Sequence, residues 1–270
     1  MSQRSSQQAA AGRPATHPAA ASRGRNIICI ASGKGGVGKT WLAITLSHVL
    51  ARSGSRTLLF DGDLGLANVD VQLGLMPERD LSGVIAGRIS LSNAVSHFTP
   101  GGFDVIAGAS GSGALAALEA PHLDDLRDDL LQLAGRYDRV VLDLGAGVDN
   151  SVRKLAEAAG TLVVVATEEP TALTDAYAFI KLTAADHLQH DLRIAVNMAS
   201  SPREGERTYA KLLKACEGFL HLSPKLAGVV RRDDRVRDSI RHQTSLLTRH
   251  PTTEAAADVE TMAKRLAPQS

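Results

Sequence analysis

The sequence predicts an α/β fold of three layers, in which a mainly parallel sheet carries helices on both faces. From residue 26 onward, short apolar segments alternate with longer segments of helical pattern. Most of the short segments are apolar throughout, which is typical of parallel strands covered on both sides. Strand and helix in alternation form βαβ units with right-handed crossovers. A glycine-rich loop between the first expected strand and the first expected helix fits the same class.

The individual elements follow from this pattern. Seven segments are expected to be strands, at residues 27–31, 57–61, 103–107, 139–144, 162–167, 192–197 and 226–230. Segments with helical spacing lie between them, at residues 40–53, 123–134, 173–186 and 206–216. A last helix is expected over residues 253–266, where Val259, Met262 and Leu266 share one face and would pack on the sheet.

The chain divides into a tail and one domain. Apart from Met1, residues 1–24 contain no large apolar residue, and they contain no acid. They therefore cannot bury enough apolar surface to fold. We expect a flexible tail there. Residues 25–268 show neither an internal repeat nor a second boundary, and we expect a single domain.

Composition excludes several classes of protein. A formal net charge of +1 argues against binding to nucleic acid or anionic lipid by bulk charge, so there is no strong nucleic-acid signal. Two cysteines, Cys29 and Cys216, are too few and too far apart for a disulfide framework or a C-x-x-C metal site. No apolar run approaches the ~18 residues that span a membrane, and no signal peptide is present. These features predict a cytoplasmic protein.

Residues 32–41 read S-G-K-G-G-V-G-K-T-W and predict a phosphate-binding loop. Gly33, Gly38, Lys39 and Thr40 satisfy the pattern G-x-x-x-x-G-K-[ST]. Glycines let successive backbone N–H groups turn inward around an anion, and the start of the following helix reinforces that site. Lys39 would neutralise the β- and γ-phosphates of ATP or ADP, and the hydroxyl of Thr40 would ligate Mg²⁺.

Three acids stand at the ends of expected strands. Asp61 is the last residue of the expected strand at 57–61, and Asp63 follows it by two residues. Asp143 lies at the end of the expected strand at 139–144. Ligands of open α/β sheets collect at the carboxyl ends of the strands, which places these carboxylates beside the phosphate-binding loop.

An additional lysine, Lys34, makes the loop more specific. The run K-G-G-V-G-K-T resembles the deviant Walker A motif of the MinD/ParA family of P-loop NTPases (SIMIBI class). The resemblance implies that Lys34 reaches the phosphates held by a second subunit, so that ATP joins a homodimer. It also implies that Asp63 positions the attacking water while Lys34 and Lys39 stabilise charge. Magnesium would be held by Thr40, Asp61 and Asp143, and the nucleotide by the loop residues Gly33, Lys34, Gly35, Gly36, Val37, Gly38, Lys39, Thr40 and Trp41.

The resemblance extends over roughly residues 25–250 and is strongest to the flagellar-number regulator branch (FlhG, FleN or YlxH). Residues 61–75, 169–177 and 197–205 carry it, and Asn197 is similar to the residue that reads the adenine edge. It implies a slow, partner-regulated ATPase that controls flagellar number or placement. Its partners would be a signal-recognition-type GTPase (FlhF type) or a flagellar transcription or assembly factor. Its location would be cytoplasmic, polar or peripheral at the inner membrane.

Two alternatives stay open. One is a MinD- or ParA-type ATPase that positions a septum, a chromosome or another cargo. The other is a nucleotide-binding scaffold with little hydrolysis. An Fe–S carrier ATPase of the same superfamily is disfavoured because its C-x-x-C is absent.

The sequence also departs from the family. Trp41 replaces a small polar residue that touches the α-phosphate, and we expect its ring to pack toward the sheet. Arg231 and Arg232 replace the usual Pro-Tyr. Arg231 is a candidate to stack on adenine, but a solvated charged run with Asp233 capping a helix is favoured.

The two ends of the chain also differ from the family. Gln8, Ala9 and Arg13 match an N-terminal activator motif only weakly. No strongly amphipathic helix follows Leu266, so membrane association is left open.

Overall fold

The computed structural model describes residues 24–108, 120–186 and 191–267. The expected tail and its Gln8, Ala9 and Arg13 lie outside the described residues. One sheet of eight strands runs in the order β3-β4-β2-β5-β1-β6-β7-β8. The strands are β1 (Ile27–Ser32), β2 (Thr57–Gly62), β3 (Ser96–Phe98), β4 (Phe103–Ile106), β5 (Arg139–Ala146), β6 (Thr161–Ala166), β7 (Asp191–Ala199) and β8 (Lys225–Arg231).

The sheet is parallel except at one edge. β1 pairs in parallel with β5 on one side and β6 on the other, and Cys29 lies opposite Leu142 and Leu162. The short strand β3 pairs antiparallel with β4. The seven strands expected from the sequence are confirmed. β3 was not expected, because three residues are too few to show a pattern and because it is anchored mainly through one apolar residue, the buried Phe98.

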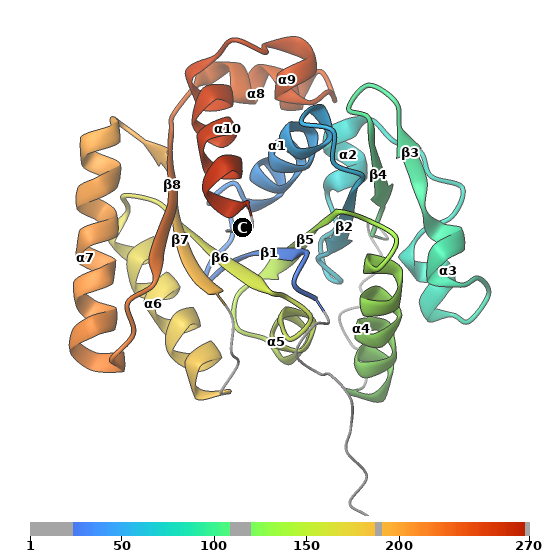
Figure 1. Ribbon diagram of the computed structural model, residues 1–270, viewed down its shortest axis with the longest axis horizontal. Coiled ribbons are helices and arrows are strands. Elements are labelled where there is room, and N and C mark those ends of the chain that lie inside the picture. The colour runs from blue at the N-terminus through green and yellow to red at the C-terminus, as the bar shows by residue number, and fades with distance from the viewer. Residues whose placement is uncertain (1–23, 109–119, 187–190, 268–270) are drawn as a thin grey trace, which may run out of the picture.

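Helices cover both faces of the sheet (Figure 1). One face is packed by α1 (Lys39–Arg52), α2 (Val69–Leu73), α9 (Leu246–Arg249) and α10 (Glu254–Leu266). The other is packed by α3 (Leu81–Ile85), the 3₁₀ helix η2 (Leu91–Ala94), α4 (Ala120–Ala134), α5 (Asn150–Ala156), α6 (Pro170–Ala185) and α7 (Pro202–Leu220). The predicted three-layer α/β class is therefore confirmed.

The short helices are the main addition to the expected elements. The five longer helices appear where they were expected, with α7 longer at both ends than predicted. α2, α3, α5, α9 and η2 have at most seven residues each, so they span at most two turns and show little periodicity. α8 (Asp234–Arg241) begins at Asp233, whose side chain accepts the N–H of Arg235, and this confirms the expected cap.

The topology places the loop after β1 at the middle of the sheet. From β1 the chain passes through α1 to β2, on the far side of β5, whereas from β5 it passes through α5 to β6 on the opposite side of β1. Such a reversal leaves a crevice at the carboxyl ends of the strands, where ligands bind in open α/β sheets. Among the described residues, no helix is long and apolar enough to cross a membrane.

Candidate functional site

The glycine-rich loop between β1 and α1 needs its glycines for two reasons. Gly36 and Gly38 have φ values of 81° and 84°, a left-handed conformation that other residues rarely adopt. At Gly33 the constraint is space, because a Cβ atom would lie 2.0 Å from the backbone oxygen of Asp175 in α6. The loop therefore packs against the start of α6 while its backbone turns tightly into α1.

Asn197, at the end of β7, braces this loop. Its buried side-chain amide donates to the carbonyl of Val37 at 2.8 Å. A Cβ atom at Gly38 would lie 2.5 Å from the same amide nitrogen, so the close approach also depends on glycine. The structure places Asn197 beside the loop, and its contact with adenine stays a prediction.

α1 begins with the two residues that would contact phosphate and metal. Lys39 is only 8% exposed, and burial lowers the pKa of its ammonium while the charges of Asp143 and Asp63 oppose that shift. No side chain caps the helix start. The free N–H groups of the first turn, the helix dipole and Lys39 together favour an anion at this point.

Asp61 and Asp143 face one another on neighbouring strands. They are register partners in the β2–β5 pair, and both are buried. Asp61 accepts N–H bonds from Asp63, Asn68 and Val69 at 3.1–3.2 Å. Burial raises the pKa of the Asp61 carboxyl, and these backbone donors only partly offset it.

Asp143 is a buried carboxylate whose charge is balanced by few neighbouring groups. Burial, and next the charge of Asp61, raise the pKa of its carboxyl, and Thr40 and Lys39 lower it. Thr40 nevertheless makes no hydrogen bond of normal geometry to it, since neither carboxylate oxygen has a partner among the described residues. Two buried carboxylates, one without partners, fit a divalent cation. In the described ranges no group of three or more His, Cys, Asp or Glu side chains is arranged to hold a metal ion, so the remaining ligands here would be Thr40, phosphate and water.

Asp63 lies at the edge of this group and is half-buried. Its Oδ1 accepts the N–H groups of Gly65 and Leu66 at 3.2 and 2.9 Å. The loop after β2 thus fixes the carboxylate, and Oδ2 takes part in no hydrogen bond with the described residues. Asp63 therefore keeps an acceptor for a water molecule.

Lys34 is held by the start of α6. Its ammonium lies 3.2 Å from Oε2 of Glu169 and 3.1 Å from Oγ1 of Thr171. The carbonyl of Lys34 accepts the hydroxyl of Ser32 at 2.6 Å. These two α6 contacts were not expected, although Glu169 heads a segment that the resemblance had singled out.

Trp41 packs into the core, as the sequence predicted. It is 5% exposed and belongs to the apolar cluster between the sheet, α1 and α10. Its Nε1 is buried and has no hydrogen-bond partner among the described residues. The structure therefore gives Trp41 a packing role, and its effect on nucleotide affinity stays a prediction.

Two hollows flank the loop. We call the first the base hollow; it has a volume of about 130 Å³ and is lined by residues that include Gly38, Trp41, Asn197, Val236 and Ile240. We call the second the loop hollow; it has a volume of about 270 Å³ and is lined by residues that include Lys34, Gly36, Glu168 and Met198. Arg232 lines both hollows and was not among the residues expected to bind nucleotide.

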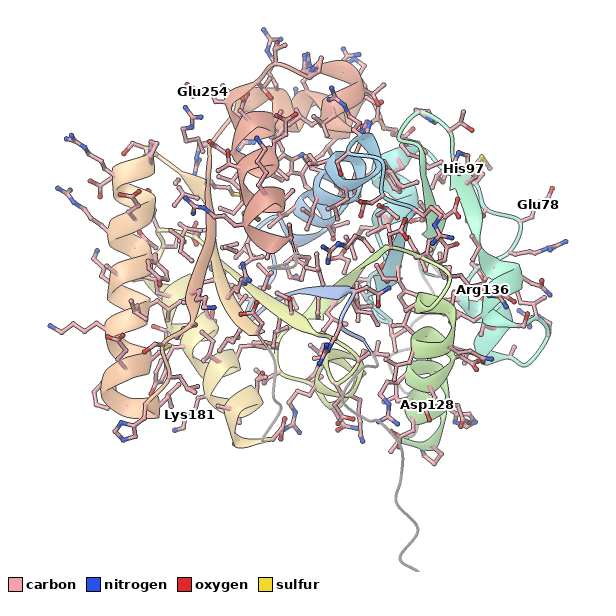
Figure 2. The ribbon with its side chains drawn as sticks, viewed as in Figure 1. Glu78, His97, Asp128, Arg136, Lys181 and Glu254 are labelled. Carbon is pink, nitrogen blue, oxygen red and sulfur yellow. The ribbon has the colours of Figure 1, made fainter. Side chains whose placement is uncertain are left out.

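Arg231 lines the base hollow but is tied to α10. Its guanidinium donates to both carboxylate oxygens of Asp258 at 2.8 Å and pairs with Glu254 at 2.6 Å. Glu254 lies at the start of α10, at the top of the view in Figure 2. Stacking of Arg231 on adenine stays a prediction, and it would have to compete with these ion pairs.

Comparisons with known proteins agree with this geometry. The profile of the CobQ/CobB/MinD/ParA nucleotide-binding domain matches residues 28–246. Antiactivator FleN of Pseudomonas aeruginosa is 38% identical over 240 residues, which is 89% of this chain and 85% of that protein. Flagellum site-determining protein YlxH of Helicobacter pylori is 33% identical over 70% of this chain and 64% of that protein.

A solved structure shows the same fold. The septum site-determining protein MinD from Pyrococcus horikoshii, complexed with Mg-ADP, superposes with a TM-score of 0.75. The alignment covers 89% of this chain and 95% of that one. At 22% identity this likeness concerns the fold alone.

Proposed function

This chain belongs to the CobQ/CobB/MinD/ParA family of P-loop nucleotide-binding ATPases, and we propose that it is an ATP-dependent dimerisation switch that regulates flagellar number or placement. Its ATPase activity would be slow and controlled by partners. The flagellar assignment rests on two relatives, an antiactivator and a flagellum site-determining protein, both at least 33% identical.

The observation that carries the proposal is the pairing of Asp61 with Asp143 beside Lys39. The two buried carboxylates favour a bound cation, and the buried ammonium of Lys39 favours a bound anion next to it. ATP with Mg²⁺ has this charge pattern. The loop N–H groups and Lys39 would hold the β- and γ-phosphates, while Thr40, Asp61 and Asp143 would hold the magnesium shell. Bound magnesium supplies charge neutralisation on the phosphates.

Hydrolysis would depend mainly on position and charge. Phosphoryl transfer needs little covalent chemistry from a protein, so catalysis comes from an oriented water and from cations around the γ-phosphate. Asp63 is fixed by the N–H groups of Gly65 and Leu66 and offers Oδ2 to a water. Lys39 and, from a second subunit, Lys34 would stabilise the charge that develops. Loss of the γ-phosphate would then release the dimer.

The dimer would transmit its state to other proteins. An FlhF-type GTPase or a flagellar transcription factor fits the flagellar relatives. Location in the cytoplasm, at a pole or at the inner face of the membrane belongs to the same proposal. A MinD-type role in positioning a septum is less supported, because septum site-determining protein MinD of Bacillus subtilis is 29% identical over 90% of this chain, whereas FleN is 38% identical over 89%.

Deletion of the encoding gene tests the flagellar role most directly. If the chain limits flagellar number, the deletion strain carries more flagella per cell, and a copy with Lys39→Ala does not restore the count. A deletion strain with normal flagella but misplaced septa or unequal chromosome segregation would support the alternative function.

A further inference from the structure

Two adjacent arginines at the end of β8 have different surroundings. Arg231 is tied to α10 not only through its guanidinium but also through its backbone N–H, which donates to Asp258 at 3.0 Å. The side chain of Arg232 takes part in no ion pair or hydrogen bond with the described residues, and it is exposed. Arg231 therefore fixes the end of the strand, whereas the guanidinium of Arg232 is free to meet a ligand.

The backbone directs Arg232 toward the glycine-rich loop. Its N–H donates to the carbonyl of Ala199 at 2.9 Å, which ties it to the end of β7. Asn197 and Met198 directly precede Ala199; both line the base hollow, and Met198 also lines the loop hollow. From this position the side chain of Arg232 borders both hollows.

The base hollow suits a flat aromatic group. Its lining includes three large apolar residues, Trp41, Val236 and Ile240. Asp233 also lines it, but the carboxylate of Asp233 is used by the N–H of Arg235. A guanidinium is planar and weakly hydrated, so it stacks on an aromatic face more readily than a lysine ammonium does.

We propose that Arg232 is a nucleotide-contacting residue whose guanidinium stacks on the base of the bound nucleotide and closes the base hollow. This assignment rests on the proposed nucleotide function. The phosphates already have two cations, Lys34 and Lys39, so a third charge is better used at the base. Arg237 lines the base hollow too, but it lies on α8 and does not border the loop hollow.

Calorimetric titration of the full chain with Mg-ATP and with Mg-ADP tests the proposal. Arg232→Ala lowers the affinity for ATP and for ADP by the same factor, about 3- to 30-fold, the range of a cation–π contact. Arg232→Lys recovers little of the loss, because an ammonium cannot stack as a plane. Arg235→Ala removes an equal charge from the same segment, lines neither hollow, and leaves both affinities unchanged. Since residue 232 is exposed, the Tm of the variant stays within a degree or two of the wild-type value.

Two results would overturn the assignment while leaving the proposed function intact. The first is wild-type affinity in Arg232→Ala. The second is a loss for ATP that is several-fold larger than for ADP and that Arg232→Lys restores, because that pattern indicates a counter-charge to the γ-phosphate. If the wild-type chain binds neither nucleotide, the proposed function fails, and the role of Arg232 fails with it.

Discussion

The ammonium of Lys34 is bound within its own subunit, 3.2 Å from Glu169 and 3.1 Å from Thr171. In the proposed dimer the same ammonium has to reach phosphates in the other subunit. The contact with α6 would therefore compete with dimerisation. A stronger contact would raise the ATP concentration that dimerisation needs. Both partners are partly exposed, at 32% and 67%, so the ion pair is weak enough to exchange.

Weakening this contact is predicted to favour the dimer. Glu169→Gln removes the charge of the acceptor, so the ATP concentration at half-maximal dimerisation falls by up to about fivefold, the scale of a partly exposed ion pair. Light scattering across an ATP titration measures the midpoint. Glu206→Gln, on the exposed face of α7, serves as the control and leaves the midpoint unchanged. A midpoint that rises in Glu169→Gln would show that Glu169 supports the dimer instead.

Asp63 is predicted to act on hydrolysis and not on binding. In Asp63→Ala, phosphate and magnesium contacts survive while the attacking water loses its acceptor. Turnover falls ~10²-fold or more, the scale of a lost general base, and the ATP-bound dimer accumulates. Single-turnover phosphate release and nucleotide affinity, measured on the same preparation, separate the two effects. Unchanged turnover would remove Asp63 from the mechanism.

Trp41 is predicted to contribute mainly to stability. Trp41→Thr leaves a cavity among α1, α10 and the sheet and lowers the free energy of unfolding by about 3–5 kcal/mol. Nucleotide affinity does not increase. Trp41→Phe costs clearly less, because it keeps most of the packing and removes the buried Nε1–H that has no partner. Denaturant unfolding of both variants checks this, and tighter ATP binding by a stable Trp41→Thr would contradict it.

His48 is predicted to make the fold less stable at mildly acidic pH. Burial, and then the charge of Arg52, lower the pKa of His48 to about 4, below its ordinary value of 6.5, and its Nδ1 pairs with Ser245 at 2.7 Å. In the unfolded chain His48 is protonated below about pH 6.5, whereas in the folded chain it is protonated only below about pH 4. The contribution is complete above pH 6.5 and is lost as the pH falls toward 4.

Denaturant unfolding at pH 7 and pH 5 tests this behaviour of His48. The wild-type chain loses more unfolding free energy between the two values than His48→Gln does. Equal losses in the two proteins would mean that His48 does not titrate as its burial implies.

Much of the fold could be predicted because its signals are local. The seven longer strands are apolar runs, and the loop and the acids Asp61, Asp63 and Asp143 stand in a recognisable order. Parallel strands bring their carboxyl ends together, so the order of the chain was enough to place the acids near Lys39.

Other features depend on contacts between distant segments. The partner of Lys34 is 135 residues away, and the brace from Asn197 to Val37 spans 160 residues, so no local pattern shows either. Arg231 and Arg232 differ in their surroundings because Asp258 and Glu254 of α10 pair with the side chain of Arg231. A pair of identical neighbours gives no sign of that in sequence.

The oligomeric state of the Lys34→Ala variant with ATP tests the proposed dimer most directly. Size-exclusion chromatography with light scattering reports the mass of the full chain, 28.4 kDa as a monomer. We predict that the wild-type chain doubles its mass with saturating Mg-ATP and not with Mg-ADP. Lys34→Ala stays monomeric while calorimetry shows that it still binds ATP. A wild-type chain that stays monomeric with bound ATP, or a Lys34→Ala chain that dimerises like the wild type, would contradict an ATP-driven dimer built on Lys34.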